Sequence, residues 1–141
     1  MSCSHESNSQ TIELEATEYE MVNNLDGVTM MAKKETVTST GLTVVFENSS
    51  NKQIIYGDSY FLEKKINEIW YKVPTSIGSN YEFTDIGYGL DASEIQEWEV
   101  NWEWLYGSLN SGEYRIVKYI LDFRAAGDYD KYHLTAEFTM K

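Results

Sequence analysis

The chain has 141 residues, enough for one domain with a single hydrophobic core. It carries 23 acidic and 11 basic side chains, a formal net charge of -12 at pH 7, and this negative field repels nucleic acids and anionic membrane surfaces. One cysteine and two histidines are too few for an internal disulfide or for a catalytic zinc site of nitrogen and sulfur ligands, so neither metal nor cofactor is expected.

The first 27 residues differ from the rest of the chain and are predicted to form a polar, acidic leader or tether. Residues 1–20 contain five glutamates and neither lysine nor arginine. A segment of this composition buries too little apolar surface to belong to a core. Residues 28–141 are therefore predicted to form the globular domain.

Residues 28–141 contain short stretches of alternating apolar and polar side chains separated by turn residues, which is typical of strands. No stretch shows a convincing helical period. The predicted strands are residues 28–33, 41–47, 60–64, 68–73, 81–86, 94–104, 113–123 and 131–140. Seven or eight strands predict an all-β fold, and two packed sheets are the simplest way to bury their apolar faces.

The clearest alternation lies in residues 94–104, where one face is predicted to be core and the other to be in water. The residues of the predicted core face are Trp98, Val100, Trp102 and Trp104. Those of the opposite face include Glu97, Glu99 and Glu103. Their regular spacing favours a solvated strand face over a pair of carboxylates for glycoside hydrolysis.

Residues 113–123 are apolar on both faces, so something must cover the outer one. Three explanations are open: residues 12–19 cover it, a partner protein covers it, or a bulge near Lys118 shifts the alternation. We favour the bulge, because it would also bring the ammonium group of Lys118 to water.

Residues 109–116 (LNSGEYRI) have the pattern Leu-x-x-Gly-x-Tyr-x-apolar. In immunoglobulin-like sandwiches, a tyrosine at this point directs its hydroxyl back to the preceding corner, and the residue two positions later lies between the sheets. Tyr114 is predicted to be this corner tyrosine. Ile116 would then stand where a cysteine is usual, with Val44 as its partner, so that apolar packing replaces the disulfide.

A longer pattern over residues 28–140 resembles the bacterial immunoglobulin-like domain of secreted and lipid-anchored proteins of Gram-positive bacteria. The segments that carry it are Gly41-Leu42-Thr43, Ile55-Tyr56-Gly57 with Tyr60, Leu62 and Glu63, Trp70-Tyr71, Trp102 with residues 106–109, and residues 112–118. The resemblance implies an immunoglobulin-like Greek-key β-sandwich without a disulfide. It implies no catalytic residues, and a domain outside the cytoplasm that serves display, contact or regulation.

Trp70 lies between Glu68 and Lys72, whereas its immediate neighbours in the sequence are apolar. The resemblance favours a core position for Trp70, since sandwiches of this kind usually bury a tryptophan in this region. The alternative is an aromatic side chain near the surface, where it could stack on a sugar or a peptide.

Cys3 is followed by a polar run, residues 4–10, and this arrangement looks like the start of a mature bacterial lipoprotein. In that case Cys3 carries the lipid and is the only contact with a membrane. The alternative is a free thiol in a polar tail.

The function predicted from the sequence is that of a non-catalytic module, secreted or lipid-anchored, that binds an unknown protein or glycan at the cell surface. The alternative is a carbohydrate-binding module that uses surface tyrosines and Trp70 as a stacking platform. Enzymatic activity is not expected, because His5 and His133 are the only histidine bases. The aspartates near the last hairpin are interpreted as turn residues rather than calcium ligands: Asp122, Asp128 and Asp130.

Overall fold

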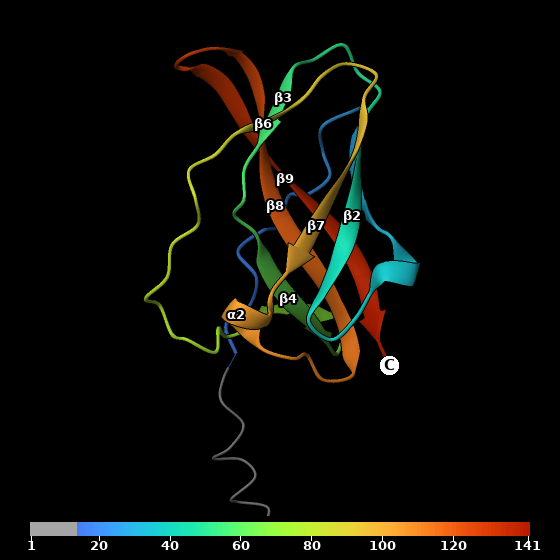
Figure 1. Ribbon diagram of the computed structural model, residues 1–141, viewed down its shortest axis with the longest axis vertical. Helices are drawn as coiled ribbons and strands as arrows, with labels where there is room; N and C mark the ends of the chain where they lie inside the picture. The colour runs from blue at the N-terminus through green and yellow to red at the C-terminus, as the bar shows by residue number, and fades with distance from the viewer. Residues whose placement is uncertain (1–13) are drawn as a thin grey trace, which may run out of the picture.

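The computed structural model describes residues 14–141, which form two antiparallel sheets packed face to face (Figure 1). One sheet has the order β1-β2-β7, and the other has the order β5-β4-β8-β3-β6 with β9 paired to β8. The strands are β1 (Val28–Ala32), β2 (Gly41–Asn48), β3 (Ile54–Tyr56), β4 (Phe61–Ile66), β5 (Ile69–Lys72), β6 (Tyr88–Leu90), β7 (Ile95–Asn101), β8 (Gly112–Ala125) and β9 (Asp128–Met140). Two short helices join them, η1 (Lys34–Thr36) and α2 (Glu103–Tyr106). The predicted all-β sandwich is confirmed.

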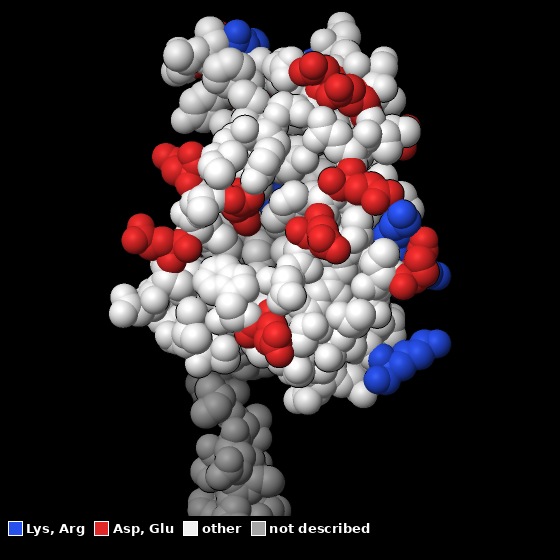
Figure 2. All heavy atoms as spheres, viewed as in Figure 1, with Lys and Arg blue, Asp and Glu red and all other residues white. Residues whose placement is uncertain are grey.

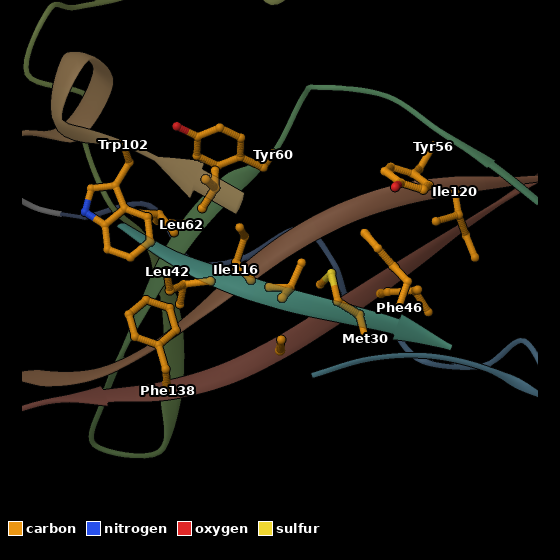
Figure 3. Close-up of a cluster of buried hydrophobic side chains, with 14 of the residues drawn as sticks. Met30, Leu42, Phe46, Tyr56, Tyr60, Leu62, Trp102, Ile116, Ile120 and Phe138 are labelled. Carbon is orange, nitrogen blue, oxygen red and sulfur yellow. The ribbon is translucent and has the colours of Figure 1, made fainter. Parts of the chain in front are cut away.

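The core lies between the two sheets and is built mainly from alternate residues of β2, β8 and β9 (Figure 3). In β2 the alternation predicted from the sequence is observed, since Leu42, Val44 and Phe46 are buried while Glu47 is exposed. Trp102, Leu42 and Phe138 lie at one end of this core, and Phe46, Tyr56 and Ile120 lie at the other.

The longest hairpin, β8 and β9, pairs without interruption from Gly112 opposite Met140 to Phe123 opposite Tyr129. Its loop contains Gly127, whose φ of 79° is in the region that favours glycine. Because the ladder is regular as far as Phe123, each face of the hairpin keeps one set of side chains up to that point.

Two predictions about the strands are wrong. Residues 81–86 belong to the loop between β5 and β6, and the short strands β3 and β6 were not predicted. A strand of three residues is too short for its alternation to stand out, so its pairing depends on the neighbours that the fold supplies. Ile54 of β3, for example, lies between Leu90 of β6 and Asp122 of β8.

The predicted strand 94–104 is also too long, because β7 ends at Asn101 and the chain turns into α2. The Asn101 side chain accepts a hydrogen bond from the Glu103 amide at 3.0 Å, and the Trp102 carbonyl accepts one from Tyr106 at 2.7 Å. Trp102 therefore stays in the core, whereas Trp104 has 47% of its surface exposed. The prediction that Trp104 is a core residue is wrong.

Residues 14–24 cross the outer face of the six-stranded sheet. Ala16 forms a bridge with Tyr71 of β5, and the ring of Tyr19 lies 4.8 Å from that of His133 on β9. Val117, in the middle of this face, is fully buried. Of the three explanations for the apolar outer face, the structure supports coverage by the N-terminal segment. This part of the predicted tether is packed on the domain, and residues 1–13 lie outside the described residues.

Candidate functional site

Tyr114 lies at the start of β8 and ties this strand to the loop before it. Its hydroxyl donates to the carbonyl of Asn110 at 2.9 Å, which is the contact expected of a corner tyrosine. Its ring is buried and stacks on that of Phe138, with the ring centres 5.7 Å apart. The contact spans four residues, so the local sequence pattern was enough to predict it.

Replacing Tyr114 by phenylalanine is expected to lower the free energy of unfolding by about 1 kcal/mol, because it removes one partly buried hydrogen bond and keeps the ring. Urea unfolding measures the change. Tyr129→Phe is the matched control, since Tyr129 is 48% exposed, and it should leave the midpoint unchanged. Equal effects of the two substitutions would show that the Tyr114 hydroxyl contributes nothing to the corner.

Ile116 of β8 and Val44 of β2 point into the core from opposite sheets, and neither has any exposed surface. They occupy the middle of the sandwich, where an apolar core takes the place of a disulfide. Trp102 is likewise fully buried, and its indole nitrogen donates to the carbonyl of Ser39 at 2.9 Å. These three residues serve the fold, and they offer no surface to a ligand.

Trp70 does not lie between the sheets, where the resemblance predicted it. The pairing of β4 with β5 places it opposite Lys65, on the outer face of the six-stranded sheet. One face of its ring is taken by the guanidinium carbon of Arg115 at 4.6 Å from the ring centre. A half-buried ring in this contact is a poor platform for a sugar.

Beside Trp70, a buried ion pair joins two strands of the outer face. Arg115 of β8 donates from Nε and Nη2 to the same oxygen of Glu63 on β4, at 2.9 and 2.8 Å. Glu63 is fully buried, and its other carboxylate oxygen has no partner among the described residues. The Thr17 hydroxyl, from the N-terminal segment, accepts from Arg115 at 3.4 Å. The sequence did not reveal this pair, because alternation shows which face of a strand a side chain occupies but not that β4 and β8 lie side by side.

Lys118 is another buried ionisable residue, and its position contradicts the predicted bulge. The pairing of β8 with β9 is regular at Lys118. On its other edge β8 pairs with β3 and then with β4, and it is this pairing that is interrupted at Lys118, in the segment between β3 and β4. The ammonium group donates to the carbonyls of Gly57 and Ser59 at 2.6 and 2.9 Å, and it lies 3.8 Å from the ring centre of Trp98. Lys118 thus satisfies backbone groups that a continuous strand would pair, and it points inward.

A groove of about 720 Å³ lies between the edge strands β1 and β9. Its apolar lining residues are Met30, Met31, Ala32, Val37, Tyr114, Ala136 and Phe138. Two lysines and two glutamates also line it, Lys34, Lys141, Glu113 and Glu137. The sequence could not reveal this groove, because it exists only where the edges of two different sheets meet.

A second surface feature is an aromatic patch next to α2. The rings of Tyr81, Phe83 and Trp104 pack edge to face, with centres 5.7 to 6.5 Å apart. Figure 2 shows acidic side chains spread over the visible face, with basic ones mostly at its margins. On this face the negative charge is therefore dispersed and does not mark a site.

Within residues 14–141, no group of three or more metal-ligating side chains is placed to hold an ion. Asp122, Asp128 and Asp130 surround the guanidinium group of Arg124, at 3.5, 3.1 and 3.0 Å. His133 packs against Tyr19, and burial lowers its pKa. No helix in this part of the chain is long and apolar enough to span a membrane.

The comparison with protein families gives the decisive match. The model of the bacterial Ig-like domain aligns with residues 24–139, which is most of the chain. The chain belongs to this family. The predicted immunoglobulin-like fold is thereby confirmed. Bacterial Ig-like domains are generally non-catalytic and often extracellular.

No curated protein matches the chain in sequence. Among solved structures, the chain is similar to the ASH/PapD-like domain 7 of human CEP192. The two are 12% identical over 86% of this chain and 94% of that one, with a TM-score of 0.33. A likeness of this degree adds nothing to the assignment.

Proposed function

We propose that this bacterial Ig-like domain is a non-catalytic module that acts outside the cytoplasm and binds another protein in the groove between β1 and β9. The observation that carries the proposal is the groove itself, where the edges of two sheets, each open over part of its length, meet beside apolar side chains. Met31, on one wall, has 66% of its surface exposed. A groove that combines apolar side chains with polar and charged ones is a usual feature of protein interaction sites.

Secretion or a lipid anchor at Cys3 would place this groove at the cell surface. Cys3 lies outside the described residues, so the polar run that follows it in the sequence is the support for this location. In cells grown with labelled palmitate, the intact chain should incorporate the label, and Cys3→Ala should not. A chain without label that stays in the cytoplasm would contradict the proposed location.

A photo-crosslinking experiment in the bacterium that encodes the chain tests the binding site. A photoreactive amino acid at position 31 lies on the groove wall, and the same group at position 95 of β7 is the control. Met31 and Ile95 are equally exposed, at 66% and 65%. We expect a crosslinked protein from position 31 and none from position 95. Equal crosslinking at both positions, or none at position 31, would contradict binding in the groove.

Carbohydrate binding remains the alternative function, and the aromatic patch of Tyr81, Phe83 and Trp104 is the observation that favours it. Rings of this type stack on sugars, and Trp104 is accessible. Trp70, which with surface tyrosines was the candidate for this alternative, is in contact with Arg115. Quenching of tryptophan fluorescence by a soluble cell-wall polysaccharide, lost in Trp104→Ala, would favour this alternative.

A further inference from the structure

The outer edge of β9 already accepts backbone groups from another part of the chain. The amide of Asn23 donates to the carbonyl of His133 at 2.8 Å, and the side-chain oxygen of Asn23 accepts from the amide of Thr135 at 3.0 Å. Asn23 therefore pairs with β9 much as one residue of an added strand would. The hydrogen bonds of Asn23 with β9 end at Thr135.

The next positions of this edge are open. In an antiparallel ladder, the backbone groups of alternate residues point to the same side, so Glu137 and Thr139 point outward as His133 and Thr135 do. The unbroken pairing of β8 with β9 preserves this alternation to the end of the strand. Among the described residues, no hydrogen bond engages the outward backbone groups of Glu137 and Thr139.

The facing edge of β1 is open in the same way. The Gly27 carbonyl accepts a hydrogen bond from the Ser49 amide, and the Lys33 amide donates one to the Thr43 carbonyl. The backbone groups of the odd-numbered residues of β1 therefore point toward β2. The backbone groups of Met30 and Ala32 consequently face away from β2, and both residues line the groove. A ligand in the groove thus meets rows of backbone donors and acceptors as well as apolar side chains.

We propose that the outer edge of β9 from Glu137 to Thr139 receives an extended segment of a partner protein, which continues the six-stranded sheet as an additional strand. This inference rests on the proposed function and names the kind of partner. The alternating donors and acceptors match a peptide backbone, which neither a glycan nor a lipid supplies. Because side chains of a strand alternate between its faces, every second residue of the segment would be apolar and lie over the groove floor.

Charge further defines the segment. The groove carries Lys34 and Lys141 together with Glu113 and Glu137, so it has no excess of either sign. The whole chain has a net charge of -12, which repels an acidic partner. The segment that fits is therefore neutral or basic as well as alternately apolar.

The test uses a phage-displayed library of random twelve-residue peptides, selected on the purified full chain. The selected peptides should alternate apolar and polar residues. Thr139→Pro removes an outward amide and leaves the ladder with β8 intact, so it should weaken their binding about tenfold. Thr139→Ala keeps the amide and is the matched control, which should bind as the unchanged chain does. Urea unfolding checks that both variants are folded.

Amide exchange gives a second readout that does not depend on a variant. On peptide binding, the amides of Glu137 and Thr139 should become protected from exchange with solvent. Equal binding by Thr139→Pro and Thr139→Ala, protection elsewhere, or failure to select any peptide would overturn strand addition. So would a dimer of the chain that Thr139→Pro converts to monomer, since the occupant would then be a second copy. Crosslinking from position 31 decides the proposed function separately.

Discussion

Replacing Arg115 by methionine is expected to lower the free energy of unfolding by about 3 to 5 kcal/mol. The substitution leaves the carboxylate of Glu63 fully buried without its partner. The remaining oxygen of Glu63 already lacks a hydrogen bond in the described structure, so no other group compensates the charge. Urea unfolding monitored by tryptophan fluorescence gives the change.

The exposed pair between Lys33 and Glu97 is the matched control for this prediction. Its nitrogen and oxygen are 2.8 Å apart, as in the buried pair, but its side chains are 36% and 54% exposed. Lys33→Met should therefore cost much less than Arg115→Met, because solvent screens the exposed pair. The double variant Glu63→Leu/Arg115→Met should recover much of the loss, because no charge remains buried. If Arg115→Met costs no more than Lys33→Met, the buried pair does not stabilise the fold.

The free energy of unfolding is expected to rise with pH between about pH 7 and pH 9 because of Lys118. Burial lowers the pKa of Lys118 from 10.5 to about 7. Between these values the unfolded chain binds a proton that the folded chain does not, so raising the pH favours the folded state. The slope is at most about 1.4 kcal/mol per pH unit.

Lys118→Met should abolish this rise, and urea unfolding of both proteins at pH 7, 8 and 9 measures it. Other shifted groups act outside this window. Burial raises the pKa of Tyr106 to about 12, and it lowers that of His133, whose ordinary value is 6.5. A flat profile in the unchanged chain would show that the carbonyls of Gly57 and Ser59 and the ring of Trp98 offset the cost of burying the ammonium group.

The features that the sequence predicted correctly are those with a local cause. The alternation of β2 and the corner at Tyr114 depend on backbone geometry and on contacts within a few residues. Trp104 shows where this reasoning fails. An apolar residue at every second position predicts a strand, but the hydrogen bonds at Asn101 and Trp102 turn the chain into α2 and bring Trp104 to the surface.

By itself, the sequence determined the two-layer all-β fold and the corner at Tyr114. Only the tertiary structure decided that Glu63 and Arg115 form a buried pair, that Lys118 points inward, and that β1 and β9 leave a groove. The partners in these features are 52 or more residues apart along the chain. Alternation shows which face of a strand a residue occupies, but the pairing of strands determines what covers that face and which edges stay open.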